Sequence, residues 1–139
     1  MMRKKLGLNS DGEEELVDEF LEWLRKSNAD YTNTFLELET PGTFADPVFA
    51  TAEFEQLRNK LAAVGFDEEL MQAANPRYIP RNYLIEEALD EYIETGALSK
   101  FKRLLTVLEN PYTSKDMGSQ FQQPPPREFD SEYTTYCNT

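Results

Sequence analysis

Two prolines mark a break between helical segments at residues 75–84, which read Asn75-Pro76-Arg77-Tyr78-Ile79-Pro80-Arg81-Asn82-Tyr83-Leu84. A proline disfavours helical backbone in the residue before it, so we expect Asn75 to end one helix and Ile79 to be extended. Pro80 has a fixed φ and no amide donor, which suit the first turn of a helix. The stretch therefore predicts a helix, a rigid elbow and a second helix.

Arg77 and Arg81 lie on this elbow and are the candidate binding residues. A guanidinium group can hold a carboxylate or a phosphate through two parallel hydrogen bonds, which would make the elbow an anion site. The alternative is a structural ion pair with one of the many acidic side chains of the chain itself. The sequence leaves both alternatives open.

Upstream of the elbow, capping residues and apolar periodicity predict four helices. The first should follow the turn residues at 9–12 and run to Ser27. A short helix at 29–38 comes next. A third helix should begin at Asp46-Pro47 and stop at Gly65, and a short fourth should run from Asp67 to Ala74.

Downstream of the elbow, two further helices are predicted on a clear apolar repeat, with Thr95-Gly96 between them and Asn110-Pro111 after the second. The short connection predicts an antiparallel hairpin. The residues expected on the core face are Ile85, Ala88, Leu89, Tyr92, Ile93, Leu98, Phe101, Leu104, Leu105 and Leu108.

These patterns predict an all-α protein, a small bundle of about five to six helices. We expect residues 1–110 to form the helical domain. Residues 111–139 contain Pro124-Pro125-Pro126 and lack periodicity, which predicts an extended or disordered tail.

Composition excludes several kinds of function. The 139 residues carry a formal net charge of −12, so nucleic acids and anionic membrane surfaces would be repelled. No apolar run approaches the roughly 20 residues needed to span a bilayer. The single Cys cannot form an internal disulfide, and with no His we expect no zinc site of Cys and His ligands.

No catalytic arrangement is visible within the chain. The absence of His removes imidazole bases and triads, and the six glycines are scattered singly, so no phosphate-binding loop is present. Clusters such as Glu13-Glu14-Glu15 are typical of exposed helix faces. We therefore predict no catalytic, cofactor-binding or metal-binding residue in this chain.

Four features together resemble the C-terminal end of the selenoprotein O family: residues 75–84, Asp30-Tyr31-Thr32, Asn110-Pro111-Tyr112 and Cys137. Members of this family are kinase-like proteins that transfer AMP from ATP to Ser, Thr and Tyr hydroxyls of proteins. The resemblance implies that this chain is the C-terminal part of a protein-kinase-like fold. ATP and Mg would bind an upstream kinase-like portion, and we expect further sequence before Met1.

Cys137 is the one functional position that the resemblance transfers. The family places a selenocysteine or a cysteine third from the C-terminus, where it can bond to a cysteine of the kinase-like portion, so the resemblance implies redox control by Cys137. The neighbouring Asn138-Thr139 and Thr135-Tyr136 depart from the family pattern. An exposed tail thiol can exchange with disulfides.

The resemblance also implies partners and location: the upstream kinase-like portion, protein substrates, and a cytoplasmic site in bacteria or a mitochondrial one in eukaryotes. The alternative hypothesis is a stand-alone acidic helical module that binds other proteins and has no catalysis of its own. The absence of His and of a glycine loop motivates that alternative.

Overall fold

A computed structural model describes residues 2–9, 11–112 and 119–125 of the chain. These residues are helical with no strands, which confirms the all-α prediction. Seven α-helices and two short 3-10 helices are present among them, against the five to six helices predicted. Contacts divide the chain into unit 1, Met1–Arg77, and unit 2, Tyr78–Thr139. The predicted division into 1–110 and 111–139 stays a prediction, because much of the tail lies outside the described residues.

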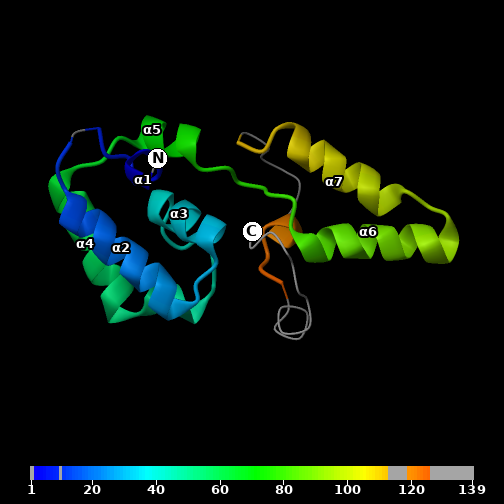
Figure 1. Ribbon diagram of the computed structural model, residues 1–139, viewed down its shortest axis with the longest axis horizontal. Coiled ribbons are helices and arrows are strands. Elements are labelled where there is room, and N and C mark those ends of the chain that lie inside the picture. Colours follow the sequence, from blue (N-terminus) through cyan, green and yellow to red (C-terminus); the bar gives the residue numbers. More distant parts are fainter. Residues whose placement is uncertain (1, 10, 113–118, 126–139) are drawn as a thin grey trace. The chain divides into compact units, whose positions relative to one another are not determined.

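Unit 1 is a cluster of short helices around one apolar core (Figure 1). Its elements are α1 (Met2–Lys5), α2 (Glu14–Ser27), α3 (Tyr31–Glu39), the 3-10 helix η1 (Pro47–Ala50), α4 (Ala52–Val64) and α5 (Glu68–Ala74). The four helices predicted upstream of the elbow correspond to α2, α3, η1 with α4, and α5. Helix α1 was not predicted, because four residues are too few to show a period.

Side-chain caps begin four elements of unit 1: α3, η1, α4 and α5. The carboxylate of Asp30 accepts from Asn33 N before α3, and that of Asp67 accepts from Leu70 N before α5. Asp46 caps only η1, and the Thr51 hydroxyl then begins α4, so the predicted third helix is broken in two. Helix α2 also differs from the prediction. Its N-cap residue is Glu13, which has a left-handed backbone conformation and forms no side-chain cap.

The core of unit 1 is rich in aromatic rings. Phe54 is fully buried, and its ring centroid lies 4.9 Å from that of Trp23 and 5.2 Å from that of Phe49. Burying one such side chain contributes about 1.5–3 kcal/mol. The buried members are Leu6, Leu8, Leu16, Phe20, Phe35, Leu38, Phe49, Phe54, Leu57, Leu61 and Met71.

Unit 2 contains the predicted hairpin. Helix α6 (Asn82–Thr95) and helix α7 (Ser99–Glu109) run antiparallel side by side, joined through Gly96 (Figure 1). The 3-10 helix η2 (Ser119–Phe121) was not predicted. Helix α6 begins two residues after Pro80, with Arg81 at its N-cap position, so Pro80 precedes the first turn.

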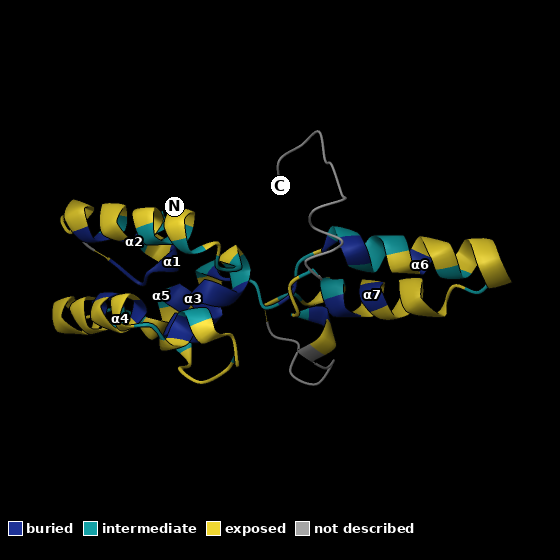
Figure 2. Cartoon of the chain, turned by 90° about the horizontal axis from the view of Figure 1, so that it is seen from below, coloured by how far each residue is buried: buried dark blue, intermediate teal, exposed yellow. Residues whose placement is uncertain are grey.

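The core of unit 2 is small: Tyr78, Leu104, Val107 and Phe121 are its buried members. The predicted core face of the hairpin is therefore only partly correct. Ala88 and Leu104 are buried, but Leu89, Tyr92, Ile93, Leu98, Phe101 and Leu105 are exposed, because no third layer of described residues covers them. Figure 2 shows the end of α6 distant from Asn82 as almost wholly exposed.

Among residues 2–9, 11–112 and 119–125, no helix combines the length and apolar character that crossing a membrane requires.

Candidate functional site

The last turn of unit 1 is held by Asn75, which is 2% exposed. Its side-chain amide donates to Lys5 O at 2.8 Å and to Met71 O at 2.9 Å, and its Oδ1 accepts from Lys5 Nζ at 3.3 Å. These bonds join the end of α5 to α1. As predicted, Asn75 is the residue that ends the helix before the elbow.

Lys5 is the most unusual charged group of this region. Its ammonium also donates to Ala74 O at 3.2 Å and lies 5.1 Å from the centroid of the Phe35 ring and 5.6 Å from that of Tyr31. Its partners are thus neutral oxygens and aromatic faces, which attract a cation through their quadrupoles. Burial lowers the pKa of Lys5 below its ordinary value of 10.5.

Arg77 lies at the end of unit 1 and forms an ion pair with an acidic residue of α3. Its Nη2 is 2.9 Å from Oε1 of Glu39, whose side chain is only 4% exposed. A charge-assisted bond to a desolvated carboxylate is stronger than one on an open surface. This contact is the structural ion pair considered from the sequence, and an additional anion at Arg77 stays a prediction.

Arg81 belongs to unit 2 and is 8% exposed. Its carbonyl accepts from the amides of Leu84 and Ile85 and so begins α6. Nearby, Tyr78 N donates to Pro111 O at 3.3 Å, which links the first residue of unit 2 to the turn after α7. Each arginine therefore lies in its own unit, and an anion contact of Arg81 and the rigidity of the elbow stay predictions.

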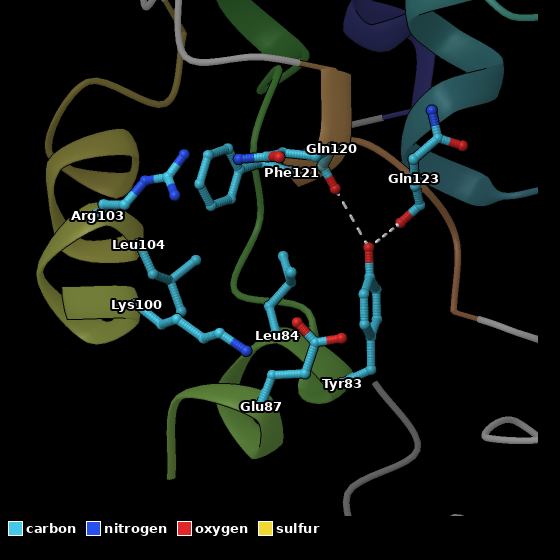
Figure 3. Close-up of a pocket in the computed structure, with 9 residues that line it drawn as sticks. All are labelled: Tyr83, Leu84, Glu87, Lys100, Arg103, Leu104, Gln120, Phe121 and Gln123. Atoms are coloured by element: carbon cyan, nitrogen blue, oxygen red, sulfur yellow. Dashed lines mark hydrogen bonds between the residues drawn. The ribbon is translucent and has the colours of Figure 1, made fainter. Parts of the chain in front are cut away.

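A pocket of about 330 Å³ lies within unit 2, between α6, α7 and the segment that contains η2 (Figure 3). Its apolar wall is formed by Leu84, Leu104 and the buried ring of Phe121. The remaining lining residues are Tyr83, Glu87, Lys100, Arg103, Gln120 and Gln123. Apolar walls with a few polar groups are typical of ligand-binding pockets.

Tyr83 fixes the far wall of this pocket. Its hydroxyl donates to Gln123 O at 2.7 Å and also lies 3.4 Å from Gln120 O (Figure 3). Two backbone carbonyls of the segment 119–125 are thereby tied to the start of α6. The segment consequently reaches the pocket at a defined place and leaves it at Gln123.

Two cations open into the pocket from α7. The guanidinium carbon of Arg103 lies 5.9 Å from the centroid of the Phe121 ring, and Lys100 and Glu87 point into the same space (Figure 3). Within the described part of the chain, neither Lys100 nor Arg103 forms an ion pair. The pocket therefore offers two positive groups and one negative group beside an aromatic ring.

The lining of this pocket contains one carboxylate, that of Glu87. Across the described residues, no group of three or more Asp, Glu, His or Cys side chains could hold a metal ion. These residues thus do not fit an ATP–Mg complex, which needs carboxylates at the metal and donors around the phosphates.

Of the residues singled out from the sequence, Cys137 lies outside the described residues, and neither Arg77 nor Arg81 lines the pocket. Sequence reasoning missed the pocket. The available signal was weak: Lys100 and Arg103 share one side of α7 at i, i+3 spacing, but nothing local places Phe121 beside them.

The comparisons with known proteins bear on the whole chain. No protein-family model matches it. It is 36% identical to protein nucleotidyltransferase YdiU of Pelagibacter ubique, over 100% of the chain and 30% of that relative. Protein nucleotidyltransferases YdiU of Alkaliphilus metalliredigens (34%, 99% of the chain) and Nitrosococcus oceani (36%, 100%) are also similar, each over 30% of its length. The chain thus spans about 30% of the length of these relatives.

Proposed function

Because this chain is homologous over its whole length to the C-terminal 30% or so of the YdiU and selenoprotein O protein nucleotidyltransferases, we propose that it is the C-terminal helical portion of such an enzyme. The activity proposed for the complete protein is transfer of AMP from ATP to Ser, Thr or Tyr hydroxyls of proteins. The observation that carries the proposal is the 36% identity across the entire chain.

The transfer itself would take place outside these residues. In it, the protein hydroxyl oxygen bonds to the α-phosphorus of ATP, the bond from that phosphorus to the bridging oxygen breaks, and pyrophosphate leaves while a base takes the hydroxyl proton. The homology implies a nucleotide substrate, and Mg is part of the proposal through the family resemblance alone. The helices of this chain would support the portion that holds both.

The exposed side chains of the hairpin support a role as a docking portion. Leu89, Ile93 and Leu105 are 45%, 77% and 47% exposed, so part of the apolar face of the hairpin is left uncovered by the residues that the structure describes. The portion of the protein that the relatives have in addition would cover them. We propose two kinds of partner: this upstream portion and the protein substrates of the complete enzyme.

Redox control by Cys137 forms the second part of the proposal. Its thiolate would attack a small-molecule disulfide, which releases one small-molecule thiol and leaves a mixed disulfide on Cys137. The thiolate of a cysteine of the upstream portion would then attack the Cys137 sulfur and displace the second small-molecule thiol. The product is one new disulfide, with two electrons passed to the small-molecule thiols that are released. Such a bond would restrain the tail and change the rate of AMP transfer.

The test is AMP transfer by this chain joined to its natural upstream sequence. Radiolabel from the α-phosphate of ATP should appear in protein Ser, Thr or Tyr, and the 139-residue chain alone should give none. Failure of the joined protein to transfer label would refute the proposed activity. A native protein of 16.1 kDa in the source cells would favour the stand-alone interaction module instead.

The redox part has a separate measurement. Oxidation with a small-molecule disulfide should change the transfer rate of the joined protein, and Cys137→Ser should remove the change while leaving the reduced rate intact. Equal responses of the two proteins would exclude Cys137 as the redox residue without affecting the assignment of the enzyme.

A further inference from the structure

The pocket of unit 2 lies at the place where the chain passes into its C-terminal residues. Gln123 lines the pocket, and its carbonyl is held by the Tyr83 hydroxyl at 2.7 Å. Glu128 follows five positions later, so it lies at most about 17 Å from Gln123 however the intervening chain runs. A segment attached so closely has a high effective concentration at the pocket.

The charges of that segment complement those of the pocket. Residues 127–133 read Arg127-Glu128-Phe129-Asp130-Ser131-Glu132-Tyr133, with three acids, one Arg and two aromatic rings. The pocket presents Lys100, Arg103 and one carboxylate, Glu87, around an apolar wall. Opposite charges at a shared apolar surface are the usual basis of peptide recognition.

The net charge of the chain disfavours the other occupants. A formal charge of −12 repels both a second copy and a free acidic protein, and a basic partner would meet the two cations unfavourably. An attached acidic segment avoids the translational cost of association. It is therefore the occupant that the observations favour.

We propose that residues 127–133 dock in this pocket, with acidic side chains at Lys100 and Arg103 and an aromatic ring on the apolar wall beside Phe121. The docked segment would set the point from which Cys137 extends. This inference depends on the chain alone and does not require the proposed AMP transfer.

The single Cys allows a direct test in the intact chain. A nitroxide attached to Cys137 should broaden amide signals around the pocket, in α7 and in residues 120–123, more than those of α2 or α4. The double variant Lys100→Glu with Arg103→Glu should lose this selective broadening. Both side chains are exposed, so the substitutions are compatible with the fold.

A matched control is available on the same helix. Lys102 is an exposed cation that does not line the pocket, and Lys102→Glu should leave the broadening unchanged. Adding Glu128→Lys, Asp130→Lys and Glu132→Lys to the double variant should restore the selective broadening. Broadening that is absent in the unsubstituted chain, or equally reduced by Lys102→Glu, would overturn the proposal.

A mixing experiment distinguishes docking within one molecule from docking of a second copy. Nitroxide-labelled chain at natural isotope abundance is mixed with isotope-enriched chain that carries no nitroxide. The enriched chain should show no broadening at the pocket, because docking is within one molecule. Pocket broadening in that mixture would overturn the proposal in favour of a second copy.

Discussion

Unit 1 and unit 2 are both built from amphipathic helices but differ in how much of their apolar surface they bury. Among the described residues, the buried hydrophobic cluster of unit 1 has eleven members, whereas that of unit 2 has four. Ile93 of α6 is 77% exposed, while Phe54 of α4 is fully buried. A helix pair has one shared seam, so a hairpin without a third layer leaves the outer part of each apolar stripe in water.

The same amphipathic periodicity has different structural outcomes in the two units. In unit 1 it describes a core that the unit completes by itself, and in unit 2 it describes a surface that another segment would have to cover. Stability should accordingly be sensitive to substitution in unit 1 and tolerant in the hairpin. Trp23, the only Trp of the chain, reports on unit 1, and hydrogen exchange of α6 and α7 reports on unit 2.

The largest difference is expected for truncation of an apolar side chain. Phe54→Ala should lower the free energy of unfolding of unit 1 by about 3–5 kcal/mol, because it opens a cavity between Trp23 and Phe49. Ile93→Ala in unit 2 should cost no more than about 0.5 kcal/mol. Urea unfolding followed by Trp23 fluorescence, with hydrogen exchange of α6, measures both. Equal losses of unfolding free energy in the two variants would show that the difference in burial does not affect stability.

A smaller contrast is expected for two glycines with the same backbone angle. Gly7 and Gly96 both have a φ of 71°, but a Cβ at Gly7 would lie 2.7 Å from Asp67 O, whereas one at Gly96 meets nothing within 4 Å. Gly7→Ala should cost about 2–4 kcal/mol, and Gly96→Ala about 1–2 kcal/mol from the left-handed angle alone. Hydrogen exchange of each unit gives the two values, and a cost at Gly96 as large as that at Gly7 would refute the close approach.

The next contrast concerns the two asparagines that precede prolines. Asn75→Ala should destabilise unit 1 by about 1–3 kcal/mol, because the carbonyl of Lys5 loses the donor from Asn75, while that of Met71 keeps only the backbone N–H of residue 75. Asn110→Ala, at an exposed position after α7, should change stability by less than about 0.5 kcal/mol. The urea midpoint followed by Trp23 fluorescence checks the first variant and exchange of α7 the second. A neutral Asn75→Ala would mean that the α1–α5 contact is dispensable.

The smallest effect is expected at exposed carboxylates. Hydrogen bonds from Arg25 and Lys26 lower the pKa of Glu22 from 4.5 to about 2, so its contribution to stability is complete above pH 4.5 and is lost as pH falls toward 2. The pKa of Glu91 in unit 2 is lowered mainly by the hydrogen bond from the Ser99 hydroxyl, so its contribution to stability is likewise lost as the pH falls. Carboxyl chemical shifts followed from pH 6 to 2 should show both depressions, and Glu22→Gln should weaken the acid dependence of α2 slightly. A Glu22 midpoint near 4.5 would contradict this.

Local signals explain what could be predicted from the sequence. Asp30, Asp67 and Asn75 act on their own helix ends through neighbouring amides and carbonyls, so their roles are visible in a few residues. The pocket could not be predicted in this way, since Tyr83 and Gln123 are 40 residues apart. The prediction that the apolar faces of α6 and α7 are buried was only partly correct for a related reason. An apolar repeat in the sequence does not show which other segment covers it.

The contact between Lys5 and Asn75 also constrains how unit 1 forms during translation. The two residues are 70 positions apart, and synthesis proceeds from the N-terminus. The contact between α1 and α5 can therefore form only after almost the whole of unit 1 has been synthesised, because the acceptors of the Lys5 ammonium lie at its end. Contacts so distant in sequence make loop closure a late and slow step, and a nascent chain of this protein would expose its aromatic core residues for longer than a bundle held by neighbouring helices.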